Sequence, residues 1–292
     1  MPESPQWSYD DAFSRNLGLI APHEQQTLRA SRVAIVGMGG VGGVHAVTLA
    51  RLGIGQFTIA DPDTFEVANF NRQYGATTRG LGRSKVEVMA EEIRAINPEA
   101  DVRLFRAVSS DNVGEFLAGA QVFIDGIDFF ALAVRRVVYR EARRRGLWAV
   151  TAAPLGFGAA WLTFAPDGMS FDEYFDLNDS MDRRDQMVAF VVGLTPRATH
   201  IPYMDLSQAN PKAHRGPSSS LACQLCSGVA AAETLKILLN RPPLRPAPCY
   251  FQFDAYRQLM RRGRLLGANR NPLQRLKRWY LRRRALQMGW DV

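Results

Sequence analysis

The sequence predicts an α/β fold: a Rossmann-like, mostly parallel sheet flanked by helices and extended by antiparallel strands. Two observations carry this prediction. Between residues 32 and 152, short runs rich in β-branched residues alternate with helical segments. Such an alternation implies right-handed crossovers between parallel strands. After Pro154 the alternation stops, so the later strands are expected to extend the sheet without crossover helices.

Five strands are expected in the first half of the chain, at residues 32–38, 56–61, 101–106, 121–125 and 147–152. The first is a short β-branched run that ends at a glycine cluster, as buried strands do. The helices between them are expected at residues 41–52, 84–96, 111–117 and 131–146. The second of these helices must stop at Asn97-Pro98, because proline cannot continue a helix.

The second half of the chain combines strands, loops and two further helices. Ser170 and Glu173 form a capping-box pattern inside an acidic stretch at 167–185, which predicts a short helix there. Residues 197–218 are rich in Pro, Ser and Asn and are expected to be a loop. The other predicted elements are a strand at 158–166, an apolar helix at 221–240, a strand at 249–256 and a basic helix at 272–288.

These elements divide the chain into three expected parts. Residues 1–30 form an N-terminal helical segment, residues 31–260 form the main domain with an acidic insert at about 167–215, and residues 261–292 form a basic tail helix. The tail holds ten Arg and Lys against one acid, which leaves 26 basic and 27 acidic residues elsewhere. The rest of the chain therefore has no excess charge for nucleic acid or a membrane.

The location of the protein is predicted from its opening segment and its cysteines. MPESPQWSYD lacks a basic start followed by an apolar run, and no stretch reaches the roughly 18 uninterrupted apolar residues of a membrane span. The three cysteines, Cys223, Cys226 and Cys249, cannot form a complete disulfide framework. We therefore expect a cytoplasmic protein without a membrane span.

A glycine cluster follows the first predicted strand directly. Gly37, Gly39 and Gly42 match the pattern G-x-G-x-x-G, with Gly40 inside it, and a helix is expected to begin in the same turn. Glycine permits the tight turn and lets backbone N–H groups approach a phosphate. Asp61 ends the second strand 19 residues after Gly42, where a carboxylate can accept hydrogen bonds from ribose hydroxyls. Together they predict a nucleotide-binding βαβ unit at residues 33–61.

Two nucleotides, NAD and ATP, are compatible with this unit, and the segment 61–85 favours ATP. A dinucleotide's diphosphate is held mainly by backbone amides, whereas a triphosphate carries more charge for cations to neutralise. The alternative for Arg72 and Lys85 in this segment is that they are ordinary solvated surface charges. The phosphate-directed side chains of the segment are Asn69, Asn71, Arg72, Gln73 and Lys85.

Three longer runs resemble a known family. They are VAIVGMGGVGG (33–43), ARLGIGQFTIADPDTFEVANFNRQ (50–73) and GRSKVEVMAEEIRAINP (82–98). They are similar to the adenylation domain of the ubiquitin-activating superfamily, whose simple homodimeric members are bacterial ThiF and MoeB. The resemblance covers about residues 12–165 and returns at 218–240. It implies that the main domain is a ThiF-like adenylation domain that uses ATP and Mg²⁺.

The resemblance also implies roles for particular residues. Asp61 would bind the ribose of ATP, while Asn69, Arg72 and Lys85 would approach its phosphates. Gln73 stands beside them with a less defined role. Asp128, in the run Asp125-Gly126-Ile127-Asp128, matches the family acid associated with magnesium and ATP. Without the resemblance, Asp128 would be interpreted as an ordinary turn carboxylate at a strand end.

The N-terminal run FSRNLGLI (13–20) is similar to the family segment whose arginine reaches the triphosphate of the partner subunit. Arg15 is therefore a candidate phosphate ligand that acts across a dimer. The resemblance implies a homodimer in which the N-terminal segment contacts the partner. Taken alone, Arg15 would be an exposed surface residue.

The chain departs from the family at its cysteines. Many relatives carry a catalytic cysteine in the crossover region, but residues 154–215 contain none. Many relatives also hold zinc with two C-x-x-C pairs, and here Cys223 and Cys226 form a single pair. One pair supplies at most two of the four ligands of structural zinc, so Cys249 and a histidine would have to complete the site. Zinc is not expected.

The leading hypothesis is an adenylyltransferase that activates a carboxylate as an acyl-adenylate, with release of pyrophosphate. The expected substrate is the C-terminus of a small ubiquitin-like or sulfur-carrier protein or peptide. A tRNA-modifying dehydratase of the same superfamily is the first alternative, because its loop resembles NFNRQ (69–73), and an NAD-dependent oxidoreductase is the second. The basic tail would bind RNA, an acidic partner or an anionic membrane surface, or else pack on the acidic insert.

Overall fold

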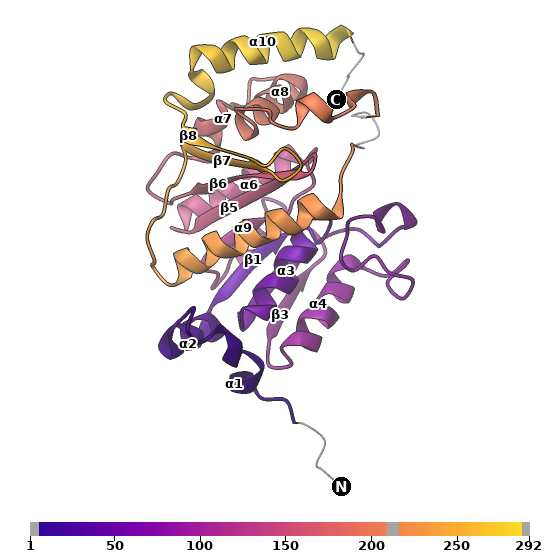
Figure 1. Cartoon of the computed structure of the whole chain (residues 1–292), viewed down its shortest axis with the longest axis vertical. Helices are drawn as coiled ribbons and strands as arrows, with labels where there is room; N and C mark the ends of the chain where they lie inside the picture. Colours follow the sequence, from indigo (N-terminus) through magenta and orange to yellow (C-terminus); the bar gives the residue numbers. More distant parts are fainter. Residues whose placement is uncertain (1–5, 209–215, 288–292) are drawn as a thin grey trace.

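An eight-stranded sheet with the order β3-β2-β1-β4-β5-β6-β7-β8 runs through the molecule (Figure 1). The computed structural model describes residues 6–208 and 216–287. This arrangement confirms the predicted fold class, a mostly parallel sheet that antiparallel strands extend. The strands are β1 Arg32–Val36, β2 Gln56–Ala60, β3 Asp101–Phe105, β4 Val122–Asp125, β5 Trp148–Leu155, β6 Gly158–Phe164, β7 Cys249–Asp254 and β8 Leu259–Arg264.

The five strands from β1 to β5 are parallel, as the alternation of strands and helices predicts. From β1 the chain moves outward to β2 and β3 on one side, and it then returns to β4 on the other side of β1. The strand order therefore reverses between β1 and β4. In open α/β sheets, ligands bind outside the carboxyl ends of the strands at such a switch point.

The last three strands are antiparallel to their neighbours. The edge strand β8, Leu259–Arg264, was not expected from the sequence, and it crosses the predicted start of the tail at residue 261. Its sequence LMRRGR has no alternation of apolar and polar residues, because most of the strand is exposed. Hydrogen-bonded pairing with β7, rather than burial, keeps it in the sheet.

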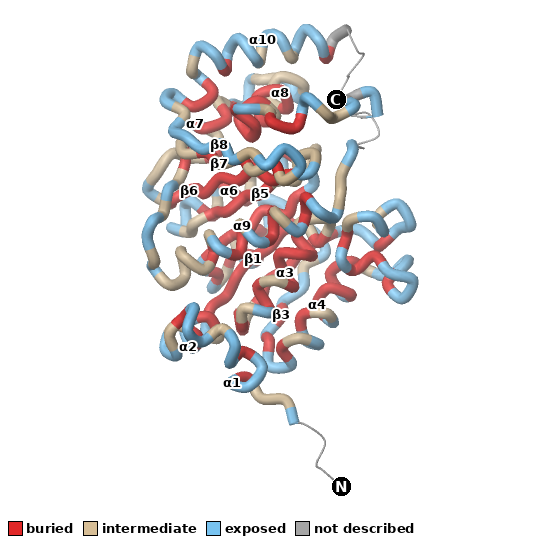
Figure 2. Tube along the Cα trace, in the orientation of Figure 1, coloured by how far each residue is buried: buried red, intermediate tan, exposed pale blue. Residues whose placement is uncertain are grey.

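Helices cover both faces of the sheet. Alternate residues of β1 point to opposite faces, so Val33 and Ile35 pack with α3, α4 and α9, whereas Ala34 and Val36 pack with α5 to α8. Figure 2 shows the resulting buried layer along the central strands. The helices are α1 Tyr9–Ala12, α2 Pro22–Ala30, α3 Gly42–Arg51, α4 Lys85–Ile96, α5 Val113–Phe116, α6 Leu132–Arg144, α7 Phe171–Phe175, α8 Arg183–Leu194, α9 Ser220–Leu238 and α10 Pro272–Gln287.

The apolar helix α9 belongs to the core. By length and hydropathy, it is the one helix of the described residues that would suffice to cross a membrane. It packs against β5, β6 and α3, and the Ser227 hydroxyl donates a hydrogen bond to Thr48 Oγ1 on α3 at 2.8 Å. Core contacts therefore account for its apolar composition.

The acidic insert and the basic tail pack on each other. The predicted capping box at Ser170 is present and begins α7. Helix α8 was not predicted, because it is buried between neighbours and its apolar residues are spread around the helix. Arg278 of α10 pairs with Asp176 at 2.5 Å, and Arg282 pairs with Asp185 at 2.7 Å. Part of the tail's charge is thus neutralised inside the chain.

The stability of the fold should depend on pH through His45 of α3. Both ring nitrogens of His45 are buried and have no hydrogen-bond partner among the described residues. Burial lowers the pKa of His45 from 6.5 to about 3. The unfolded chain takes up a proton near pH 6.5 and the folded chain does not. Stability is therefore complete above pH 6.5 and is lost progressively as the pH falls towards 3.

A His45→Leu variant should lose this dependence. For one such group the loss in the free energy of unfolding at pH 4.5 is about 3 kcal/mol. Urea unfolding of both proteins at pH 7.5 and pH 4.5 isolates this contribution, because other titrating groups are shared. When the pH is lowered from 7.5 to 4.5, the free energy of unfolding should fall by about 2–3 kcal/mol less in the variant than in the wild type. Equal pH dependence in both proteins would contradict this account of His45.

Candidate nucleotide-binding site

The predicted glycine loop lies at the switch point, between the carboxyl ends of β1 and β4. Gly37 has a φ of +88°, which side chains rarely adopt, and its N–H donates to Ala60 O at 2.7 Å. Gly126 follows β4 and its N–H donates to Val36 O at 2.9 Å. The two turns therefore lie side by side.

Glycine is required here because three backbone segments meet without space for side chains. A Cβ on Gly37 would lie 2.0 Å from Gly126 O, and one on Gly42 would lie 1.7 Å from Gly37 O. A Cβ on Gly126 would lie 2.8 Å from Gly42 Cα. The role of Gly126 was not predicted, because a single glycine at a strand end has no pattern of its own.

The loop exposes backbone donors at the N-terminus of α3. The N–H groups of residues 39–42 donate no hydrogen bond to another described residue. A Cβ on Gly39 would have only the Gln73 side chain within 4 Å, and Gln73 Oε1 is buried without a partner among the described residues. Free amides at a helix N-terminus attract an anion. This is the observation that fits a phosphate group to the loop.

Asp61 lies beside the glycine loop, at the end of β2. Its Oδ2 accepts a hydrogen bond from Met38 N at 2.6 Å, and its Oδ1 accepts one from Asp63 N at 2.9 Å. Burial raises the pKa of Asp61, while the nearby charge of Lys85 and the two backbone donors oppose that shift. The buried carboxylate is thus held in place by the same loop that it adjoins.

The segment between β2 and α4 brings its polar side chains towards the glycine loop. Arg72 has its Cγ 3.7 Å from the position of a Gly40 Cβ, and its Nη1 donates to Ala68 O at 2.9 Å. Gln73 is buried. Asn69 ends the short 3-10 helix Val67–Asn69, and its side chain accepts a hydrogen bond from Glu66 N. The structure therefore brings Arg72 and Gln73 against the loop, with Asn69 one turn away.

Lys85 begins α4 and is buried. Its Nζ donates to Asp63 Oδ2 at 3.0 Å, and its N–H donates to Asp63 O at 3.0 Å. The predicted surface alternative for Lys85 is therefore wrong. An ammonium group held at 3.0 Å from an exposed carboxylate can exchange that partner for a phosphate.

Asp128 follows β4 on the other side of the glycine loop. It is exposed, and its Oδ1 accepts a hydrogen bond from Phe130 N at 2.9 Å. Behind it, Arg135 of α6 pairs with the buried Asp125 at 2.9 Å and donates to Ile127 O and Asp128 O. This buried ion pair fixes the turn that presents Asp128. The sequence analysis missed Arg135, because an arginine on an amphipathic helix normally faces solvent.

The carboxylate of Asp128 is compatible with a magnesium ion that is bound together with ATP. Mg²⁺ in nucleotide sites usually binds one or two carboxylates together with substrate phosphates, and Asp128 supplies such a carboxylate. Within residues 6–208 and 216–287, no group of three or more His, Cys, Asp or Glu side chains could hold a metal ion. Cys223 and Cys226 are buried on α9, where Cys223 Sγ packs against Gly40.

Arg15 lies far from this site in its own chain. It belongs to the 3-10 helix Ser14–Asn16, and Asn16 Nδ2 donates to Leu52 O just beyond the C-terminal end of α3. The glycine loop is at the opposite end of α3, which spans residues 42–51. A helix of this length separates the two ends by roughly 15 Å. Arg15, which is exposed, therefore does not reach its own glycine loop. The role across a dimer stays a prediction beside that of an exposed surface residue.

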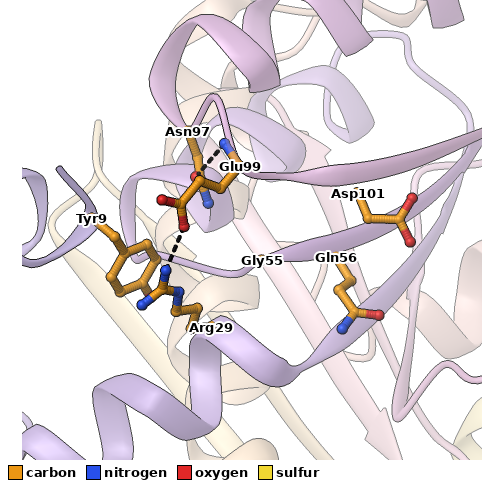
Figure 3. A pocket seen from close by; sticks show the side chains of 7 residues that line it. All are labelled: Tyr9, Arg29, Gly55, Gln56, Asn97, Glu99 and Asp101. Carbon is orange, nitrogen blue, oxygen red and sulfur yellow. Dashed lines mark hydrogen bonds and ion pairs between the residues drawn. The ribbon is translucent and has the colours of Figure 1, made fainter. Parts of the chain in front are cut away.

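A small open pocket lies at the amino-terminal ends of the parallel strands, whereas the glycine loop lies at their carboxyl ends. It has a volume of about 180 Å³ and is lined by Gln56 at the start of β2 and Asp101 at the start of β3 (Figure 3). Arg29 crosses it to pair with Glu99 and packs over the Tyr9 ring at 4.4 Å. Because these amino-terminal strand ends face away from the switch point, this pocket is not part of the nucleotide site.

Gly126→Ala should be destabilising, because its Cβ would meet backbone atoms that cannot move aside. We expect a loss of about 1–3 kcal/mol in the free energy of unfolding. Gly228→Ala is the matched control, since Gly228 is exposed on α9 and a Cβ there has open space. This control should be neutral or stabilising by up to about 1 kcal/mol. Urea titration measures both, and equal stabilities would refute the packing argument.

Comparison with known proteins points to one family. A model of the ThiF family matches residues 13–276. The chain is 39% identical over 152 residues to the tRNA threonylcarbamoyladenosine dehydratase of Escherichia coli (strain K12), across 50% of this chain and 56% of that protein. It is 33% identical over 161 residues to the SAMP-activating enzyme E1 of Haloferax volcanii, across 54% of this chain and 59% of that protein. It thus spans less than two thirds of these relatives.

The fold is similar to that of a solved structure, Escherichia coli MccB with ATP. The TM-score is 0.67 at 17% identity, over 89% of this chain and 73% of that one. At this identity the likeness concerns the fold alone. The family match extends over most of the chain and agrees with the resemblance that the nucleotide-loop sequences predict. The chain belongs to the ThiF family.

Proposed function

We propose that this protein is an ATP- and magnesium-dependent adenylyltransferase that activates a carboxylate as an acyl-adenylate. One observation carries the proposal: a loop of free backbone amides is flanked by Asp61 on one side, by Arg72 and Lys85 on the second and by Asp128 on the third. These groups match the parts of ATP in order. Asp61 suits the ribose, the amides and cations suit the phosphates, and Asp128 suits the metal ion.

The cations distinguish ATP from NAD. NAD carries two phosphates, which backbone amides alone can hold, so a buried lysine beside the loop would be superfluous. Lys85 is buried close enough to Asp61 for its charge to act on that carboxylate, and its Nζ is ion-paired with the exposed Asp63. A triphosphate gives both Lys85 and Arg72 a ligand of matching charge. The two cations therefore favour adenylyl transfer over hydride transfer.

The reaction would proceed by in-line displacement at the α-phosphorus. A carboxylate oxygen of the substrate forms the new P–O bond, the bond to the bridging oxygen breaks, and pyrophosphate departs with the electron pair. Arg72 and Lys85 would stabilise the charge that develops on the departing pyrophosphate. When bound, magnesium supplies further charge neutralisation on the phosphates. No strong general base is needed, because the attacking carboxylate is already ionised.

The carboxylate most consistent with the family is a polypeptide C-terminus, and a tRNA-borne carboxylate is the second candidate. One relative is named for activating SAMP and another for dehydrating tRNA threonylcarbamoyladenosine. The threonyl group of the latter also carries a carboxylate. The greater identity to the dehydratase is the specific observation that keeps this alternative open.

The acceptor of the acyl group would lie outside this chain. Residues 154–215 contain no cysteine. Cys223 and Cys226 lie near the loop, but burial raises the pKa of both thiols. A thiol with a raised pKa is a poor nucleophile at neutral pH. The proposed enzyme therefore forms the adenylate and passes it to another molecule.

ATP–pyrophosphate exchange tests the proposed reaction. The wild type should exchange labelled pyrophosphate into ATP when given Gly-Gly-ending peptides, small carboxylates or modified tRNA. Asp128→Ala should lower the exchange rate at least hundredfold, as the loss of one electrostatic group commonly does. Asp167→Ala, at an exposed turn after β6 on the other edge, is the matched control. Absence of exchange with every carboxylate, together with tight NAD binding, would overturn the proposal.

Mixed dimers test the proposed role of Arg15. Arg15→Ala and Asp128→Ala should each be inactive alone. In a mixed dimer, one site combines an intact Asp128 with an intact Arg15 from the other subunit. Random exchange of subunits should therefore restore about a quarter of the wild-type activity. If native mass spectrometry shows subunit exchange and no activity returns, Arg15 does not act across the dimer.

A further inference from the structure

Three aromatic side chains form a cluster at the carboxyl ends of the parallel strands, the end of the sheet where the nucleotide loop also lies. We call Phe157, Tyr203 and Tyr256 the aromatic shelf. The ring centroids of Phe157 and Tyr203 lie 5.7 Å apart and nearly parallel, and Tyr256 lies 5.7 Å from Phe157 and 5.1 Å from Tyr203. They come from the β5–β6 turn, the 3-10 helix Ile201–Tyr203 and the β7–β8 turn.

The topology explains why these turns share an edge with the nucleotide loop. β5 is parallel to β4, and β7 is antiparallel to β6, so β5 and β7 both end where β1 and β4 end. Ala255 N donates to Phe157 O at 3.3 Å, which joins the two turns directly. In Figure 1 the β7–β8 turn, the N-terminus of α9 and the loop before α4 all face the same side.

Hydrogen bonds to a buried carboxylate and to the backbone fix the position of the aromatic shelf. The Phe157 N–H donates to the Tyr203 hydroxyl at 3.0 Å, and that hydroxyl donates to Asp254 at 3.0 Å. Asp254 is fully buried. Gly156 has a φ of +58°, and a Cβ there would lie 2.4 Å from the Tyr203 hydroxyl. The position of Tyr203 therefore requires glycine in the turn.

The rings are nevertheless open to solvent. Phe157 is 40% exposed and Tyr256 is 69% exposed. Packing of the protein core does not account for them, since neither belongs to the buried clusters of the sheet. A rigid, solvent-exposed group of aromatic rings is typical of a binding surface, because it loses little conformational entropy when a ligand stacks on it.

Direct contacts join the shelf to the nucleotide site. The Ser219 hydroxyl donates to Gly156 O at 3.3 Å. One residue earlier, Ser218 O accepts a hydrogen bond from Asn71 Nδ2 at 3.0 Å, and Asn71 adjoins Arg72. Two hydrogen bonds, made by the adjacent residues Ser218 and Ser219, therefore join the turn of the shelf to the segment that carries Arg72.

We propose that the aromatic shelf binds an apolar or aromatic side chain that lies next to the activated carboxyl group of the substrate. This inference rests on the proposed adenylation. Two charged residues adjoin the shelf: the buried Asp254 accepts from Tyr203, and Arg257 donates to Thr199 O at 2.9 Å. The three rings themselves offer stacking and apolar contact, which favours a planar or apolar side chain.

Non-hydrolysable mimics of the acyl-adenylate provide the test. We choose 5′-O-(N-acylsulfamoyl)adenosines that carry Phe-Gly, Leu-Gly, Asp-Gly or Gly-Gly as the acyl group, with affinities measured by calorimetry. The wild type should bind the Phe-Gly mimic at least tenfold more tightly than the Gly-Gly mimic. Asp-Gly should show no gain. Tyr256→Ala should reduce the preference for Phe-Gly to about twofold or less, and Tyr256→Phe should retain it.

The matched control is Tyr280→Ala, which removes another exposed tyrosine, on α10. This control should leave the preference for Phe-Gly unchanged. Tyr256→Ala should bind ATP with the same affinity as the wild type. The inference is overturned if the wild type binds Phe-Gly and Gly-Gly equally, or if Tyr256→Ala keeps the preference. It is also overturned if Tyr256→Ala weakens tRNA binding while the peptide mimics are unaffected. Failure of the wild type to bind ATP or any mimic refutes the adenylation itself.

Discussion

The close approach of three backbone segments at the ends of β1 and β4 is the constraint on which the site depends. Gly37, Gly42 and Gly126 leave no space for a side chain, so the first turn of α3 starts directly against the sheet. Only this approach leaves the amides of residues 39–42 free at the helix N-terminus. The reversal of strand order between β1 and β4 opens the sheet at the same point. The same close packing of backbone thus shapes both the centre of the sheet and the candidate nucleotide site.

Positive and negative groups surround the glycine loop at different positions. The free amides and the cations Arg72 and Lys85 favour an anion, whereas Asp61 and Asp128 lie on its two sides, where a ribose and a metal ion are expected. Each charged group has internal support. Backbone N–H groups hold Asp61, Asp63 holds Lys85, and the buried pair of Arg135 with Asp125 fixes the turn of Asp128. The arrangement is therefore formed before any ligand binds.

Periodic features of the fold could be predicted from the sequence, and features without a period could not. The strands β1 to β5 and the helices α3, α4 and α6 have the strand runs and helical spacing that identify them. By contrast, α8 is buried around its circumference, and β8 is exposed along its length, so neither has a one-sided pattern. At the site, Asp61 and Lys85 were predicted by motif and loop composition. Arg135 and Gly126 were missed, because their roles come from contacts between distant segments.

Calorimetric titration of the protein with ATP–Mg²⁺ and, separately, with NAD tests the central claim most directly. Lys85→Met keeps the aliphatic stem and removes the charge, while Arg83→Met removes an exposed cation that pairs with Glu91 outside the site. We predict that the wild type binds ATP, that Lys85→Met weakens this binding roughly ten- to hundredfold, and that Arg83→Met does not weaken it. Tight binding of NAD without binding of ATP, or ATP binding that is insensitive to Lys85→Met, would contradict the account.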